Sequence, residues 1–230
     1  MIEVLWHGRG GQGAFTAARL LGAASSFADG SYALAFPSFG PERRGAPMRA
    51  FTKMSRKPIG DRSAVSRANY VIYLDDTLLG EGWEDELLPD GKVIVNSVRS
   101  FGDPRIVAID ANGISQEILG RPIPNTALLG ALCSVCDYVS ADNVKRAIEG
   151  YMPAKLHEKN KRVVDAALEA VGKTRAAGVA VNTDESLESQ VIGSVSRETT
   201  KDAHFDAPAS RGETVIPTLQ TAALDPADFA

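Results

Sequence analysis

Two short segments of this 230-residue chain carry residues that could bind an anion. The first has a G-x-G-x-x-G pattern, and its members are Gly8, Arg9, Gly10, Gly11, Gln12 and Gly13. Glycines allow positive φ angles and close backbone approach, and N–H groups at the start of a helix attract negative charge. Arg9 adds a forked, charged donor. The pattern indicates a site for a phosphate, a pyrophosphate or a carboxylate, and tight packing of a strand on a helix is the structural alternative.

The second segment covers residues 36–47 and combines aromatic residues, prolines and glycines with the adjacent Arg43 and Arg44. In open sheets of parallel strands, the loops at the carboxyl ends of the strands gather around ligands. We therefore expect this segment to lie beside the glycine loop. Arg43 and Arg44 become candidate binders of a phosphate or of a partner's carboxylate. Their alternative is an ion pair with Glu42 or simple solvation.

A nicotinamide or flavin dinucleotide is the obvious ligand for a glycine loop between a strand and a helix. Such a site needs an acidic residue at the end of the second strand, where it binds the ribose. Here the second predicted strand runs into residues 36–40, which contain no acid, and Asp29 lies in the turn before that strand. The sequence thus favours an anion site over a site for NAD.

Six strands and four helices are predicted to position these loops. Short runs of β-branched and apolar residues predict strands over residues 2–6, 32–36, 49–54, 69–74, 92–96 and 105–110. Apolar residues at helical spacing predict helices over residues 13–28, 125–136, 141–150 and 157–171, with Asp142 as the N-cap of the third. Because several strands are apolar throughout, we expect an α/β fold with a mostly parallel sheet and helices on both faces.

The composition excludes several classes of protein. The chain is 44% hydrophobic with a net charge of −4, so it has no global basic field for nucleic acid. No apolar run approaches the about 18 residues of a membrane span, and the first residues lack the features of a signal peptide, which predicts a cytoplasmic protein. Its two cysteines are too few for an iron–sulfur cluster or a closed zinc site, which need about four ligands.

The amino-acid composition changes after residue 172. Residues 173–230 are rich in small and polar residues, and their apolar residues are scattered singly. We expect this segment to be an extended C-terminal arm that packs on partner subunits. The candidate anchors are Phe205, Val215, Ile216, Leu219 and Phe229.

Other polar residues have simple structural interpretations. Cys133 and Cys136 form a C-x-x-C pattern inside a predicted helix, which favours buried core residues over a redox pair. His7 precedes the glycine loop and either contacts a ligand or is satisfied by the backbone. Residues 84–86 are expected to be a solvated acidic face, and residues 75–76 either contact a ligand or cap the next segment.

Four segments carry a family resemblance. Residues 5–13 and 36–47, together with 125–131 and 158–160, resemble the gamma subunit or gamma domain of 2-oxoacid:ferredoxin (acceptor) oxidoreductases. Pyruvate and 2-oxoglutarate synthases belong to this group, and phenylglyoxylate-type enzymes are also similar. The resemblance covers about residues 1–172. It predicts a Rossmann-like α/β gamma domain over that range, followed by the arm of residues 173–230.

The resemblance implies a multi-subunit enzyme that decarboxylates a 2-oxoacid on thiamine diphosphate and yields an acyl-CoA. Thiamine diphosphate, Mg²⁺ and the iron–sulfur clusters are expected in alpha-, beta- and delta-type partner subunits, and electrons pass to ferredoxin or to an NAD-reducing subunit. The role implied for this chain is to bind the phosphates of coenzyme A through residues 8–13, Arg43 and Arg44. The alternatives are a purely structural docking subunit and a stand-alone NAD(P)-binding oxidoreductase. The substrate stays open among pyruvate, 2-oxoglutarate, branched-chain and aryl 2-oxoacids.

Overall fold

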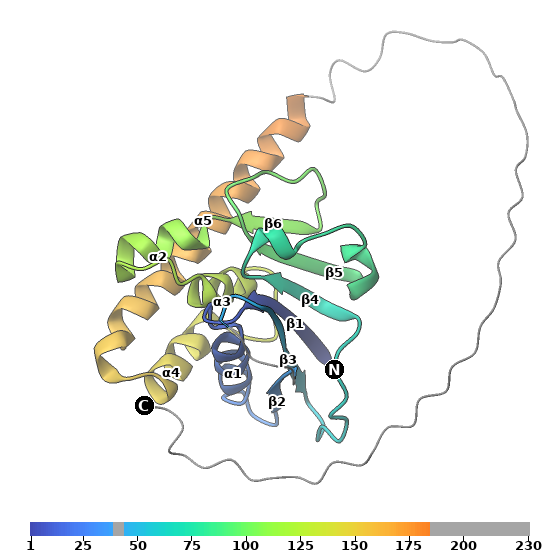
Figure 1. Ribbon diagram of the computed structural model, residues 1–230, viewed down its shortest axis with the longest axis vertical. Helices are drawn as coiled ribbons and strands as arrows, with labels where there is room; N and C mark the ends of the chain where they lie inside the picture. Colours follow the sequence, from blue (N-terminus) through green and yellow to red (C-terminus); the bar gives the residue numbers. More distant parts are fainter. Residues whose placement is uncertain (39–43, 185–230) are drawn as a thin grey trace, which may run out of the picture. The chain divides into compact units, whose positions relative to one another are not determined.

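The computed structural model describes residues 1–38 and 44–184, with side chains through residue 173. Its strands form one sheet in the order β2-β3-β1-β4-β5-β6 (Figure 1). The strands are β1 (Ile2–Arg9), β2 (Tyr32–Pro37), β3 (Pro47–Ser55), β4 (Ala68–Tyr73), β5 (Leu87–Asn96) and β6 (Ile106–Ile109). Strands β1, β4, β5 and β6 run parallel, whereas β3 is antiparallel to both β1 and β2. The predicted α/β class with a mostly parallel sheet is confirmed.

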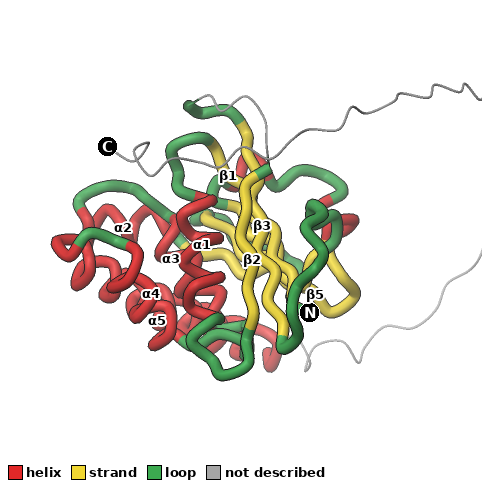
Figure 2. The backbone as a smooth tube through the Cα atoms, turned by 90° about the horizontal axis from the view of Figure 1, so that it is seen from below, coloured by secondary structure: helices red, strands yellow, loops and turns green. Residues whose placement is uncertain are grey.

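The two faces of the sheet are covered unequally. The α-helices are α1 (Ala14–Ser25), α2 (Ala111–Leu119), α3 (Asn125–Cys133), α4 (Ala141–Tyr151) and α5 (His157–Asp184). The short 3₁₀ helices are η1 (Asp76–Leu78), η2 (Trp83–Glu86) and η3 (Ala154–Leu156). Buried residues of all five α-helices share one core with one face of the sheet, and Figure 2 shows these helices together on one side of the strands. The opposite face packs against Leu78 of η1 and Trp83 of η2, so its helical cover is 3₁₀ rather than α.

Alternation along the strands explains why both faces are apolar. In β1, Val4 and Trp6 point into the core beneath the α-helices, whereas Leu5 points to the other face. In β4, Ile72 and Val71 divide in the same way. Because successive side chains of a strand point to opposite faces, a strand that is covered on both must be apolar throughout.

Some element boundaries differ from the sequence expectation. Strand β1 continues to Arg9, because its pairing with β3 extends to the residue pair Arg9 and Pro47. The N-cap of α4 is Ser140, whose hydroxyl accepts a hydrogen bond from the N–H of Asn143 at 3.2 Å; the predicted cap, Asp142, lies in the first turn instead. Helix α3 ends at Cys133, before the second cysteine of the C-x-x-C pattern.

The last helix is longer than predicted. Helix α5 continues to Asp184, so residues 173–184, the start of the predicted arm, are helical. The rest of the arm, with its five candidate anchors, lies outside the described residues. By its contacts the chain divides into the units Met1–Glu188 and Ser189–Ala230, and the elements above belong to the first. None of the described helices is both long and apolar enough to cross a membrane.

Candidate functional site

The glycine loop connects β1 to α1 and needs its glycines for backbone reasons. Gly11 has φ 97° and Gly13 has φ 82°, a left-handed conformation that costs other residues energy. Gly13 is also the N-cap of α1, and no side chain caps this helix. The loop therefore presents bare backbone at the start of a helix.

The segment after the second strand lies beside this loop, as the sequence predicts. Gly10 forms a parallel bridge with Arg44. The N–H of Gly10 donates to the carbonyl oxygen of Ala46 at 2.9 Å, and the N–H of Gly45 donates to the carbonyl oxygen of Gly10 at 3.0 Å. Arg44 is exposed, and it forms no ion pair with any described residue. Arg43 lies outside the described residues, and so does Glu42, the alternative partner of the two arginines.

Several N–H groups converge at the start of α1. The first intrahelical bond joins the N–H of Ala17 to the carbonyl oxygen of Gly13 at 3.0 Å, so the three preceding N–H groups of the helix are free of intrahelical partners. In the described part of the chain, the N–H groups of Gly11 and Gly13 also have no acceptor. The first turn of α1 contains no acidic residue. Together with the helix dipole, these donors make a site that suits an anion.

Arg9 is engaged within the protein, whereas Arg44 has no ion-pair partner in the part of the chain that the structure describes. Its Nε donates to Oδ2 of Asp75 at 2.8 Å, and its Nη2 donates to the hydroxyl of Thr77 at 2.8 Å. Partial burial alone would raise the pKa of Asp75, but the hydrogen bonds from Thr77 and Arg9 lower that pKa below its ordinary value. Asp75 is therefore a charged partner for Arg9 at neutral pH, and it also caps η1.

Gln12 closes the glycine loop on itself. Its Oε1 accepts the N–H of Arg9 at 2.7 Å, and its Nε2 donates to Oδ2 of Asp75 at 3.4 Å. These bonds engage both ends of the amide within the protein, so Gln12 shapes the loop. Of the predicted site residues, the structure thus separates a group that builds the loop, Arg9 and Gln12, from the exposed Arg44.

A buried polar network supports the loop from the side of the α-helices. Nδ2 of Asn125 donates to the carbonyl oxygen of Gly13 at 3.4 Å, and the Asn125 side chain fills the space that a Cβ at position 13 would need. Oδ1 of Asn125 accepts the N–H of Thr126 at 2.8 Å, and the Thr126 hydroxyl lies 3.0 Å from Oδ1 of Asn160. The network therefore brings together three segments that carry the resemblance. Residues 125–131 and 158–160 are hydrogen-bonded to each other beneath the glycine loop of residues 8–13.

Sequence reasoning missed a second polar cluster, which lies next to the glycine loop because His7 directly precedes Gly8. Nε2 of His7 lies 2.8 Å from Oε2 of Glu86, and the hydroxyl of Tyr73 donates to the same oxygen at 3.0 Å. The rings of His7 and Tyr73 stack, with centroids 4.6 Å apart. Glu86 was expected to be solvated, but it joins η2 to the sheet. The register of His7 opposite Tyr73 could have suggested the stack, whereas nothing local indicates Glu86.

The protonation behaviour of this cluster follows from its hydrogen bonds. Burial raises the pKa of Tyr73, and the neighbouring charge of Glu86 raises it further. Burial alone would raise the pKa of Glu86 as well, but its contact with His7, the hydrogen bond from Tyr73 and the charge of Arg49 lower it. Glu86 is therefore the charged member of the pair with Tyr73.

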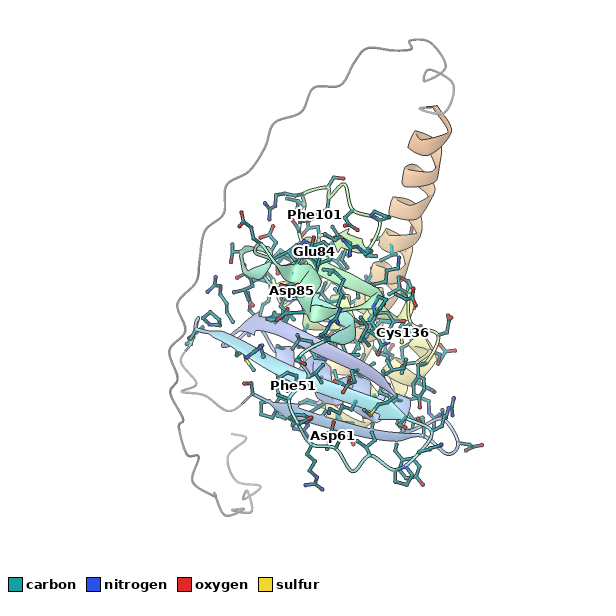
Figure 3. All side chains as sticks on the ribbon, turned by 90° about the vertical axis from the view of Figure 1, so that its right-hand side faces the viewer. Phe51, Asp61, Glu84, Asp85, Phe101 and Cys136 are labelled. Carbon is teal, nitrogen blue, oxygen red and sulfur yellow. The ribbon has the colours of Figure 1, made fainter. Side chains whose placement is uncertain are left out.

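The described residues do not fit a metal centre or an iron–sulfur cluster. Among them, no three His, Cys, Asp or Glu residues lie where they could hold a metal ion. Figure 3 shows Asp61 well apart from Glu84 and Asp85, which lie together on η2. Burial raises the pKa of Cys133 to about 12 and also raises that of Cys136, so neither thiol is readily ionised. Cys136 is buried and Cys133 half-buried, as expected for core residues.

The strand order also argues against a dinucleotide site. Strand β3 lies between β1 and β2, so the end of β2 is not adjacent to the glycine loop's own strand. Strand β2 ends in Phe36 and Pro37. Asp29 lies in the turn before β2, where its carbonyl oxygen accepts a hydrogen bond from Arg56 at 3.0 Å. Among the described residues, the end of β2 therefore offers no acid where a dinucleotide fold places one for the ribose.

Comparisons with known proteins agree on one family. Residues 3–170 match the family described as Pyruvate ferredoxin/flavodoxin oxidoreductase. The chain is 44% identical over 182 residues to pyruvate synthase subunit PorC of Methanothermobacter thermautotrophicus, covering 76% of this chain and 98% of that protein. It is 43% identical over 188 residues to the common gamma subunit of the pyruvate/ketoisovalerate oxidoreductases of Pyrococcus furiosus, covering 76% and 97%. The crystal structure of the PORC subunit of pyruvate oxidoreductase from Thermotoga maritima matches with a TM-score of 0.64 and 36% identity, covering 74% of this chain and 96% of that one.

Proposed function

Because the chain belongs to the pyruvate ferredoxin/flavodoxin oxidoreductase family, as a gamma-type subunit, we propose that it works inside an enzyme that converts a 2-oxoacid to an acyl-CoA by oxidative decarboxylation. In this proposal, alpha-, beta- and delta-type partners bind thiamine diphosphate with Mg²⁺ and the iron–sulfur clusters. Ferredoxin or an NAD-reducing subunit receives the electrons.

The contribution proposed for this chain is to bind the phosphates of coenzyme A. The observation that carries this proposal is the contact between the glycine loop and the segment of Arg44, with Gly10 hydrogen-bonded to both Gly45 and Ala46. It puts free N–H groups of a helix start and an exposed arginine on adjacent stretches of backbone. Coenzyme A carries a pyrophosphate and a separate phosphate, and these are the groups that such donors bind.

Each donor suits a different part of that ligand. The N–H groups at the start of α1 are fixed in direction and gain from the helix dipole, so they fit the pyrophosphate. Arg44 presents a planar fork that can bind two phosphate oxygens at once. Arg43 is assigned to the same role as a neighbour of Arg44 in sequence.

The assembled complex tests this proposal. We expect Arg44→Ala, alone and with Arg43→Ala, to raise the KM for coenzyme A about tenfold, the loss that follows from one charge-assisted hydrogen bond. The KM for the 2-oxoacid should stay unchanged. The matched control is Arg56→Ala. Arg56 is an exposed arginine that directly follows β3, at the end of this strand that is remote from the glycine loop.

An unchanged KM for coenzyme A in an intact complex would contradict the binding role. The chain would then be a docking subunit only. Binding of coenzyme A to the complex by calorimetry gives the same answer without turnover, because a docking subunit leaves the affinity of the complex unaltered when Arg44 is replaced.

A further inference from the structure

We propose that Asp75 and Thr77 are positioning residues for the phosphate-binding loops, and that they act through Arg9 to hold Arg44 in place. This inference rests on the function proposed above. It assigns a role to the start of η1, where the sequence left residues 75–76 open between a ligand contact and a cap.

The guanidinium of Arg9 joins three separate segments of the chain. Arg9 itself belongs to the glycine loop. Its Nε and Nη2 donate to Asp75 and Thr77, both at 2.8 Å, and its Nη1 donates to the carbonyl oxygen of Gly45 at 3.3 Å. The arginine thus connects the end of β4 to the segment that carries Arg44.

Asp75 is itself held in one orientation. Its Oδ1 accepts the N–H of Thr77 at 3.0 Å and the hydroxyl of Thr77 at 2.6 Å. This leaves Oδ2 for Arg9 at 2.8 Å and for Gln12 at 3.4 Å. Both carboxylate oxygens are therefore in use, and the Thr77 hydroxyl serves twice, as a donor to Asp75 and as an acceptor from Arg9.

The link from Arg9 to Gly45 adds to the backbone bonds that hold the Arg44 segment. Gly45 has φ 83° and is exposed, so this turn contributes little packing of its own. Within residues 1–38 and 44–184, this turn is attached through the bonds with Gly10 and the contact with Arg9. If Asp75 no longer orients Arg9, the guanidinium is free to move and the turn loses one of its attachments.

Charge explains why the two arginines divide the work. The carboxylate of Asp75 balances the charge of Arg9 at 2.8 Å, so an anionic ligand gains little from Arg9. The charge of Arg44 is not balanced by any described residue. Asp75 therefore turns Arg9 into a structural group and leaves Arg44 to contact the ligand.

The experiment measures steady-state kinetics of the complex assembled with its partner subunits. We expect Asp75→Asn and Thr77→Val each to raise the KM for coenzyme A about fivefold, while kcat at saturating coenzyme A and the KM for the 2-oxoacid stay unchanged. Thr77→Ser keeps the hydroxyl and should restore the parent KM. Because Thr77 is exposed, its variants test the idea even if Asp75→Asn fails to fold.

A double-mutant cycle shows whether the effect passes through Arg44. Once Arg44 is replaced by Ala, its position no longer matters, so Asp75→Asn should then add less than twofold to the KM. The matched control is Asp103→Asn, which removes a carboxylate from the pair with Arg105, 2.6 Å apart and next to the amino end of β6. It should leave the KM for coenzyme A at the parent value.

Three results would overturn the inference. One is an unchanged or lower KM for coenzyme A in both Asp75→Asn and Thr77→Val while Arg44→Ala raises it, which leaves the proposed function intact. Another is a double variant, Asp75→Asn with Arg44→Ala, in which the KM for coenzyme A rises by the product of the two single-variant fold-changes. The third is a lack of effect of Arg44→Ala itself, which overturns the proposed function and this inference together.

Discussion

At the scale of single residues, the candidate site shows how the partner of a side chain decides its role. Arg9 and Arg44 have the same chemistry; Arg9 belongs to the glycine loop and Arg44 lies beside it. Arg9 is paired with Asp75, which is 66 positions away in sequence, whereas Arg44 is exposed. The sequence therefore made both arginines equal candidates, and the fold separates them. The cluster of His7, Tyr73 and Glu86 escaped sequence analysis for the same reason, since Glu86 is 79 positions from His7.

Glu86 predicts a pH dependence of stability. Its pKa is lower in the folded state than its ordinary value of 4.5, so its contribution is present above about pH 4.5 and is lost as the pH falls through the folded pKa. We expect Glu86→Gln to lower the free energy of unfolding by about 1 kcal/mol at pH 7. As the pH falls through the lowered pKa of Glu86, the difference from the parent should shrink towards zero, because glutamine resembles the protonated acid. Urea unfolding at pH 7 and at a series of lower pH values measures this, and a difference that stays constant with pH would contradict it.

The two cysteines predict slow thiol chemistry. Burial raises the pKa of Cys133 to about 12 and also raises that of Cys136. Since the thiolate is the reactive form, iodoacetamide at pH 8 should modify the folded chain at least about tenfold more slowly than a free cysteine. Mass spectrometry follows the modification, and the urea-unfolded chain, which should react fully, is the control. Rapid labelling of Cys133 in the folded chain would be inconsistent with its burial.

At the scale of elements, α3 is the helix that links the glycine loop to the rest of the fold. Its first residue, Asn125, contacts Gly13, and its middle packs closely on α5. The two helices pack tightly at Gly130, where an added Cβ would lie 2.8 Å from the carbonyl oxygen of Val164 and 3.1 Å from Cβ of Ala167. A glycine inside this helix is therefore required by packing.

This contact predicts opposite effects for two glycine substitutions. Gly130→Ala should lower the free energy of unfolding by about 2 kcal/mol, because the new methyl group meets the backbone of α5. Gly150→Ala in α4 is the matched control, since a Cβ there meets no heavy atom within 4 Å. It should raise stability by about 0.5 kcal/mol through helix propensity. Thermal and urea unfolding report both, and a neutral Gly130→Ala would mean that α3 and α5 separate easily.

At the scale of the whole molecule, one antiparallel strand changes how the fold can be used. Strand β3 fills the position beside β1 that the second strand holds in a dinucleotide fold. Its start also brings residues 44–46 to Gly10. The strand order that disfavours NAD thus creates the neighbourhood on which the coenzyme A proposal stands.

The division of the chain predicts the effect of a truncation. We propose that the C-terminal arm anchors partner subunits, and α5 shows that a cut after residue 173 would remove part of a helix. A cut after Glu188 preserves the whole first unit. The shortened chain should unfold at the parent temperature but co-purify less well with its partner subunits. Equal recovery of the complex would show that residues 189–230 are not an anchor.

The sequence by itself determined the class of the fold, the course of most strands and helices, and the family. These features depend on local periodicity and on contiguous motifs, which residues close in sequence define. The sequence also predicted that the segment of Arg44 lies beside the glycine loop, because the carboxyl ends of parallel strands lie at the same end of the sheet. Only the tertiary structure decided the position of β3, the different environments of Arg9 and Arg44, and the contacts of Glu86. Each depends on residues far apart in sequence, whose meeting is set by how the strands pair.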